Sequence, residues 1–163
     1  MSKRSGFSML ELLVVIVIIG ILSALGWSSM NEVIQTNRAK EASRTLAAFA
    51  ERAVAESKMR KDSVQISIAG NALEARLALT NELLFKQTLD NGFSDGGTST
   101  PLNCTKLSNV TTQVRIGLSG INGEGCFVAC NSSGSYCGSA AKAANKNTFA
   151  AYIKRKNSDW EEL

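Results

Sequence analysis

One long apolar run near the start of the chain limits what the protein can fold into more than any other feature. Residues 7–25 read FSMLELLVVIVIIGILSAL, and Glu11 is the one charged residue among them. A helix over residues 7–27 would span about 30 Å, which is the thickness of the hydrocarbon core of a bilayer. Lys3 and Arg4 precede the run, so the positive-inside rule keeps the N-terminus in the cytoplasm. The sequence therefore predicts a membrane-anchoring helix.

The position of Glu11 indicates more than an anchor. A carboxylate in hydrocarbon costs about 2.5–3.5 kcal/mol on insertion scales, which marks such a residue as functional. A secretory signal peptide is cut after its apolar run, whereas here the plausible cut, after Gly6, precedes the run and leaves the helix in the mature chain. The cut would create an α-amino cation at Phe7, with which Glu11 of a neighbouring subunit could pair. An uncleaved anchor is the alternative, and it leaves Glu11 unexplained.

These residues resemble a known leader. Residues 6–16, Gly-Phe-Ser-Met-Leu-Glu-Leu-Leu-Val-Val-Ile, are similar to the class III leader of type IV pilins and type II secretion pseudopilins. The resemblance implies that Gly6 and Phe7 flank a prepilin peptidase site. It also implies that Phe7 becomes N-methylated and that Glu11 is the assembly glutamate. Major pilins usually carry a helix-kinking proline where this chain has Ser28, so the resemblance favours a minor pilin or a pseudopilin.

The resemblance also implies a location and a set of partners. The protein would be a single-pass inner-membrane protein with a periplasmic globular domain, and after assembly it would be part of a pilus or pseudopilus. Its partners would be other pilins or pseudopilins, a prepilin peptidase and an inner-membrane assembly platform.

The helix is expected to continue to about residue 60. Apolar residues recur there at helical spacing and form one stripe. They are Val33, Ala42, Leu46, Phe49, Ala50, Ala53 and Val54. Residues 31–79, which include Asn-Arg-Ala-Lys-Glu-Ala-Ser-Arg-Thr-Leu and then Ser-Val-Gln-Ile-Ser-Ile, look like the GspH/FimT group of minor pilins and H-type pseudopilins.

The remainder of the chain predicts a β-rich domain. Alternating apolar residues around the Gly70–Asn71 turn predict a hairpin over residues 63–79, with a short helix over residues 73–79 as the alternative. Further short elements are expected over residues 83–89, 110–118, 126–130 and 149–153, with a loop over residues 91–104. The fold class is α+β: a long N-terminal helix packed on a C-terminal antiparallel sheet of about four to seven strands, the arrangement of pilins. The expected divisions are a leader (1–6), a transmembrane or filament-core helix (7–27), its amphipathic continuation (28–60) and a globular domain (61–163).

Four cysteines lie close together in the last 60 residues of the chain, at Cys104, Cys126, Cys130 and Cys137. An even number in a small glycine-rich region behind an export signal predicts two disulfides in an oxidising compartment. Three pairings are possible. We favour Cys104 with Cys126 and Cys130 with Cys137, because residues 131–136 form a natural short loop. A zinc site is the alternative, although the spacing is not that of a standard zinc knuckle.

The composition argues against an enzyme. Histidine is absent, which removes the commonest general base and a common metal ligand. The glycine-rich segments lack the lysine and the strand–loop–helix context of a phosphate-binding loop. Asp90, Asn91 and Asp95 lack the spacing of a calcium loop. We therefore expect no catalytic activity, no cofactor and no metal site.

A basic cluster near the C-terminus suggests an alternative function. Lys154, Arg155 and Lys156 are consecutive, and Tyr152 and Trp160 lie close by in the sequence. Cations beside aromatic rings can hold the phosphates and bases of DNA. Some minor pilins of the resembled group take up DNA in natural transformation, although this chain lacks their Gly-Arg-x-Arg form. A solvated end of an edge strand explains the cluster equally well.

Overall fold

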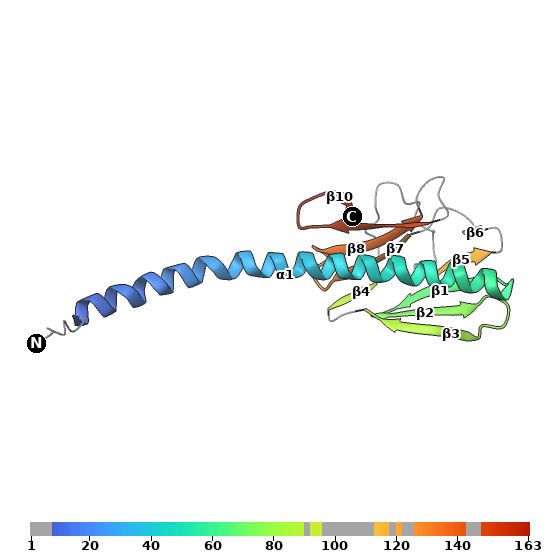
Figure 1. Cartoon of the computed structure of the whole chain (residues 1–163), viewed down its shortest axis with the longest axis horizontal. Helices are drawn as coiled ribbons and strands as arrows, with labels where there is room; N and C mark the ends of the chain where they lie inside the picture. Colours follow the sequence, from blue (N-terminus) through green and yellow to red (C-terminus); the bar gives the residue numbers. More distant parts are fainter. Residues whose placement is uncertain (1–7, 90–91, 96–112, 118–119, 122–125, 143–147) are drawn as a thin grey trace, which may run out of the picture. The chain divides into compact units, whose positions relative to one another are not determined.

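The computed structural model describes residues 8–89, 92–95, 113–117, 120–121, 126–142 and 148–163 (Figure 1). The chain forms two compact units, residues 1–35 and residues 36–163. One helix, α1, runs from Met9 to Arg60 and has residues in both units. All described strands belong to the second unit.

The ends of α1 follow from local chemistry. Ser8 caps the N-terminus, where its side-chain oxygen accepts a hydrogen bond from the backbone N–H of Leu10 at 3.3 Å. At the other end Lys61 adopts a left-handed backbone with φ of 53°, and the backbone N–H of Asp62 donates to the carbonyl of Ser57. Lys58 and Arg60 in the last turn complement the negative end of the helix dipole. The predicted helix over residues 7–60 therefore agrees with α1 where the chain is described.

The strands that the structure describes form two antiparallel sheets of five strands each. The strands in chain order are β1 (Val64–Ala69), β2 (Ala72–Leu77), β3 (Leu83–Thr88), β4 (Phe93–Asp95), β5 (Gln113–Gly117), β6 (Gly120–Ile121), β7 (Cys126–Asn131), β8 (Cys137–Lys142), β9 (Phe149–Lys154) and β10 (Trp160–Glu162). The first sheet has the order β3-β2-β1-β5-β6, and the second has the order β10-β9-β8-β7-β4. The predicted α+β fold is confirmed, but the single sheet of about four to seven strands is wrong, because the strands divide between two sheets.

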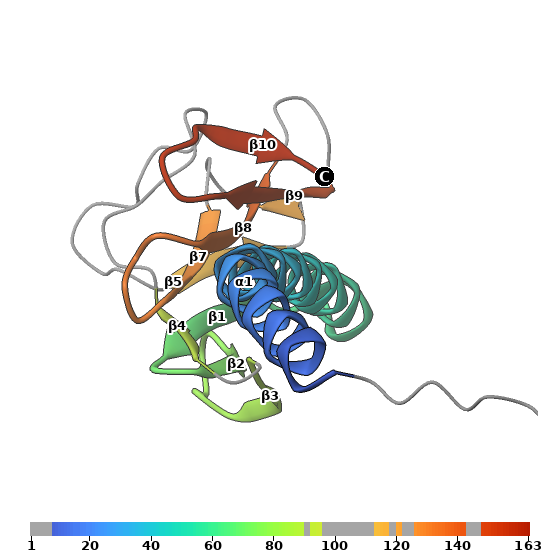
Figure 2. The ribbon, with the colours of Figure 1, turned by 90° about the vertical axis from the view of Figure 1, so that its left-hand side faces the viewer.

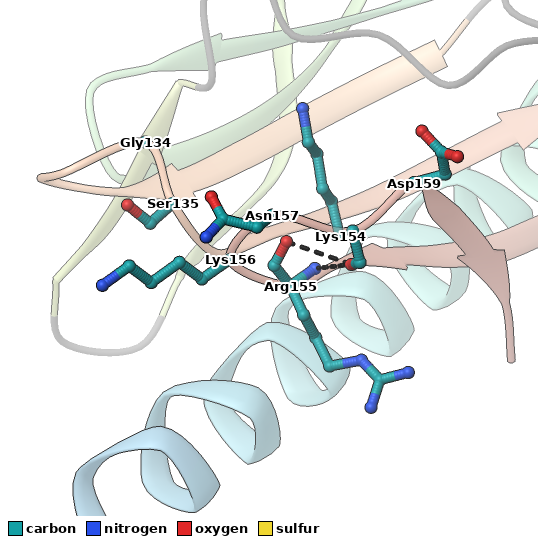
Figure 3. Close-up of a pocket in the computed structure, with 8 residues that line it drawn as sticks. Gly134, Ser135, Lys154, Arg155, Lys156, Asn157 and Asp159 are labelled. Carbon is teal, nitrogen blue, oxygen red and sulfur yellow. Dashed lines mark hydrogen bonds between the residues drawn. The ribbon is translucent and has the colours of Figure 1, made fainter. Parts of the chain in front are cut away.

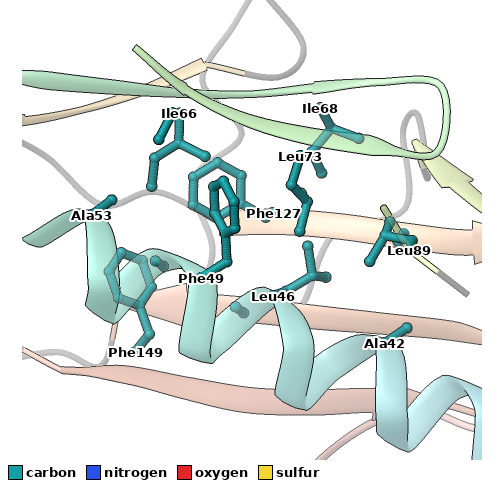
Figure 4. Packing of buried hydrophobic residues seen from close by; sticks show 14 of the residues in the cluster. Ala42, Leu46, Phe49, Ala53, Ile66, Ile68, Leu73, Leu89, Phe127 and Phe149 are labelled. Carbon is teal, nitrogen blue, oxygen red and sulfur yellow. The ribbon is translucent and has the colours of Figure 1, made fainter. Parts of the chain in front are cut away.

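The core of the second unit lies between α1 and both sheets (Figures 2 and 4). Phe49 of α1 is 3% exposed, and its ring centroid lies 4.9 Å from that of Phe85 on β3. Phe127 and Phe149 enter the same cluster from the second sheet. The predicted stripe is buried apart from Val33, which is 56% exposed and belongs to the first unit.

Small residues bring α1 unusually close to β8. A Cβ atom on Gly138 would lie 2.6 Å from the carbonyl oxygen of Ala39 and 2.7 Å from the backbone nitrogen of Ser43. The Ser43 hydroxyl donates a buried hydrogen bond of 3.0 Å to the carbonyl of Ser139. This contact fixes the register of α1 against the second sheet.

The sequence analysis missed three strands of the second sheet, which are β4, β8 and β10. Residues 93–95 form β4 inside the predicted loop of residues 91–104, because Phe93 is 2% exposed and enters the core. Strand β8, with the sequence CGSAAK, lacks the large β-branched residues that mark strands, because small side chains are needed under α1.

Candidate functional site

The first unit presents an apolar helix surface. Each large apolar side chain from Met9 to Leu22 is between 45% and 92% exposed. Among the described residues, α1 is the one helix that contains a stretch long and apolar enough to cross a membrane. Such a surface needs lipid or other helices around it.

Glu11 lies in the first turn of α1 and its side chain is exposed. Its backbone N–H donates to the carbonyl of Ser8 at 3.0 Å, so the backbone there is already helical. Its neighbours Leu10 and Leu12 are 73% and 60% exposed. The carboxylate therefore stands on an apolar surface, where a cationic partner from another chain would relieve the cost of burying it.

A disulfide joins the ends of the loop between β7 and β8. Cys130 and Cys137 are bonded, with Cα atoms 4.1 Å apart. This is the pairing predicted for these two residues, and it excludes them as thiolate ligands of zinc. Cys104 lies outside the described residues, so its pairing with Cys126 stays a prediction.

The loop that this disulfide closes is ordered by one side chain. The Asn131 side-chain oxygen accepts hydrogen bonds from the backbone N–H groups of Ser135 at 3.1 Å and Tyr136 at 3.2 Å. Trp160 of β10 packs against the small cluster that contains Cys130 and Cys137. The sequence analysis did not find this link; the signal available was an Asn-Ser-Ser-Gly turn between two cysteines.

The predicted basic cluster lies at the turn between β9 and β10. Arg155 forms an ion pair of 2.6 Å with Glu161, and its backbone N–H donates to the Ser158 hydroxyl at 3.0 Å. Figure 3 shows the charged ends of Lys154, Arg155 and Lys156 pointing in different directions.

A shallow pocket of about 420 Å³ lies beside this turn and is shared with the disulfide loop. Its lining residues are Gly134, Ser135 and residues 154–159. Within the part of the chain that the structure describes, neither Lys154 nor Lys156 has a salt-bridge partner. The turn thus offers two unpaired ammonium groups beside an arginine that is already paired.

No group of histidine, cysteine, aspartate and glutamate side chains in the described ranges is arranged to hold a metal ion. The candidate functional features of the described residues are therefore the apolar helix with Glu11, the disulfide loop and the basic turn.

Comparison with known families decides what the N-terminal segment is. The family model of the prokaryotic N-terminal methylation motif matches residues 1–27. The chain carries this methylation motif. None of the curated proteins compared with the chain matches it, and none of the solved structures does. The methylation motif supports a precursor like those of type IV pilins and pseudopilins, which agrees with the fold of one long helix packed on antiparallel sheets.

The motif covers all three residues that the leader resemblance singled out. Gly6 and Phe7 lie within the matched segment but outside the described residues, so their roles in cleavage and methylation stay predictions. Glu11 lies in both the motif and the described part of α1. The motif implies processing by a prepilin peptidase and assembly with other pilins.

Proposed function

We propose that the protein is a minor pilin or pseudopilin, a structural subunit of a type IV pilus or of a type II secretion filament. A prepilin peptidase cuts between Gly6 and Phe7, and Phe7 is then methylated. Before assembly the subunit is anchored in the inner membrane, with residues 36–163 in the periplasm. It enters the filament through α1.

One observation carries this proposal. The methylation motif at residues 1–27 continues without a break into a helix of 52 residues. The exposed apolar side chains of its first part suit a membrane before assembly and a bundle of helices after it. The buried stripe of its second part carries the β-rich unit. The two parts of this helix are what a subunit needs if it is to move from the membrane into a filament.

Glu11 gives the assembly step its chemistry. Cleavage would leave a cationic α-amino group at Phe7, and Glu11 is the one carboxylate in the apolar run. Pairing the Glu11 carboxylate of one subunit with the Phe7 amine of the next neutralises two charges that are each costly in an apolar environment. The pair would form at one axial register of two helices, so it would guide an incoming subunit to its place.

The mass of the mature chain tests the processing step. The protein is expressed with a prepilin peptidase in membranes, and the intact chain is measured by mass spectrometry. We expect a chain that begins at Phe7 and carries one added methyl group. A control with Gly6→Val is expected to retain Met1, because the side chain blocks the cut. A wild-type chain that retains Met1 beside an active peptidase contradicts the proposal.

DNA uptake is the second candidate function. It is supported by the unpaired ammonium groups of Lys154 and Lys156, and the divergent directions of the cluster argue for contacts spread along a strand. Binding of the full chain in detergent to double-stranded DNA would be measured at several salt concentrations, for the wild type and for Lys154→Ala/Arg155→Ala/Lys156→Ala. Salt-dependent binding that the triple variant loses supports this function. Absent or salt-insensitive binding by the wild type rules it out.

A further inference from the structure

The basic turn lies at a definite end of the second unit. Gly138, the second residue of β8, packs against the backbone of Ala39 and Ser43, so the Cys137 end of β8 lies beside the first residues that α1 contributes to the second unit. Strand β9 runs back antiparallel to β8, with Lys154 paired to Cys137. The turn after Lys154 therefore lies at the end of the unit where α1 enters it, as Figure 1 also shows.

The disulfide loop reaches the same end of the unit. It joins β7 to β8 just before Cys137, and its residues Gly134 and Ser135 line one pocket with residues 154–159. The Cys130–Cys137 bond and the packing of Trp160 hold the two turns together. The disulfide and the packing of Trp160 thus hold the backbone that carries the basic residues in place.

Positive charge is in excess at this end. We call the surface formed by Arg38, Lys40 and residues 154–156 the basal surface. Arg38 and Lys40 flank Ala39 on α1, so they lie beside the contact with β8. Among the residues that the structure describes, the acidic residues of the same end are Glu41, Asp159 and Glu161, and Glu161 is already paired with Arg155. Among the described residues of this end, five cationic side chains therefore outnumber three acidic side chains.

The connection between the predicted membrane helix and the second unit is short. Only residues 28–35 separate the predicted membrane helix, residues 7–27, from Thr36, where the second unit begins. In a helix these residues extend about 12 Å, and tilt of the helix shortens the separation. The headgroup layer takes up about 5–7 Å of that distance. This short connection lets the basal surface come within about one Debye length, roughly 8–10 Å, of the headgroups.

We propose that the basal surface binds the anionic headgroups of the membrane in which the chain is anchored, and so holds the unassembled subunit against the bilayer. Charge complementarity selects this partner, since cations near an anionic surface are attracted to it. Divergent ammonium groups suit a plane that carries many separate phosphates better than one phosphate in a pocket. Entry into a filament would then require release of this contact.

The test uses the full chain in lipid nanodiscs. One set contains phosphatidylcholine alone, and the other contains phosphatidylcholine with about one third phosphatidylglycerol. Amide hydrogen exchange is followed by mass spectrometry in peptides that cover the turn of residues 155–158. We expect slower exchange in the anionic nanodiscs at low salt, and no difference between the two sets at high salt.

A matched pair of variants locates the effect. Lys154→Gln/Lys156→Gln removes two charges from the basal surface and leaves the Arg155–Glu161 pair intact. Lys58→Gln/Lys61→Gln removes two exposed charges at the C-terminal end of α1, the opposite end of the unit. The first variant is expected to lower the equilibrium constant for forming the lipid-bound state about 30-fold, and the second is expected to leave it unchanged.

The outcomes separate this proposal from the functions above. Equal exchange in both nanodiscs, or an equal loss in the two variants, overturns the proposal. Protection of the turn by added DNA but not by anionic lipid overturns it too, and supports DNA binding instead. The proposal rests on membrane anchoring alone, which recovery of the chain in the nanodisc peak checks separately. Its failure therefore leaves processing and assembly standing.

Discussion

Replacing Gly138 by alanine should destabilise the second unit through its contact with α1. The added Cβ would lie 2.6 Å from the carbonyl oxygen of Ala39, and 2.7 Å and 3.1 Å from the backbone nitrogen and Cα of Ser43. These are backbone atoms of a helix, so no side chain can rotate away and α1 must move off β8. Overpacking of this kind costs about 1–3 kcal/mol. The shift also lengthens the 3.0 Å hydrogen bond from Ser43 to Ser139, which adds about 1 kcal/mol.

The expected loss is therefore about 2–4 kcal/mol, a large part of the stability of about 5–15 kcal/mol that is typical of a domain. Urea unfolding of the full chain in mild detergent measures it. Trp160 fluorescence reports the β-rich unit if Trp27 is replaced by phenylalanine. With a urea dependence of about 2 kcal/mol per molar, the midpoint should fall by about 1–2 M.

The control is Ser139→Ala in the next position of the same strand. The Ser139 hydroxyl is fully buried and has no hydrogen-bond partner among the described residues. Its removal relieves an unsatisfied polar group and should raise stability by about 1 kcal/mol. If Gly138→Ala unfolds at the same urea concentration as the wild type, the close contact between α1 and β8 is not what sets the register. A destabilised Ser139→Ala variant would contradict the account of the hydroxyl.

Two further perturbations test the second unit. Replacing both Cys130 and Cys137 by serine should cost about 2–3 kcal/mol in urea unfolding, because the disulfide closes only a short loop; an unchanged midpoint would contradict this. Lys86 and Arg76 lower the pKa of Glu74 in the folded protein. The stability that this carboxylate contributes is therefore fully present above its unfolded-state pKa of about 4.3. It is lost as the pH falls through the lower folded-state pKa. Glu74→Gln should therefore lose less stability than the wild type between pH 5 and pH 2, and an identical pH profile would count against the ion pairs.

The sequence was most informative where one physical requirement governs many residues. Helical spacing of apolar residues located the buried face of α1, and strict alternation located the hairpin of β1 and β2, in which Val64 pairs with Leu77. The apolar run with its single carboxylate led to the family resemblance that the methylation motif confirms at residues 1–27. In each case the pattern depends on local periodicity or on a short motif.

The sequence was least informative where contacts between distant segments determine which residues form a strand and which strands pair. Strand β8 is made of small residues because α1 lies against Gly138, and nothing local in CGSAAK predicts that neighbour. The division into two sheets depends on which strands pair, and β1 pairs with β5 across a long stretch of intervening chain. The basic turn and the disulfide loop lie at the same end of the unit because Cys137 of β8 pairs with Lys154 of β9. A single sequence does not reveal that register.

The proposed function requires that the chain enters a filament through α1, with the Glu11 carboxylate paired to a neighbouring subunit. The most direct test measures how much of the chain enters the filament fraction of cells that produce the filament system, for the wild type, Glu11→Gln and Glu32→Gln. Glu32 is an exposed carboxylate on the same helix beyond the apolar run, so it is a matched control. We expect Glu11→Gln to be processed but to enter filaments about tenfold less or worse, because an unpaired amine in an apolar core costs several kcal/mol. We expect Glu32→Gln to behave as the wild type. Normal incorporation of processed Glu11→Gln would contradict the account.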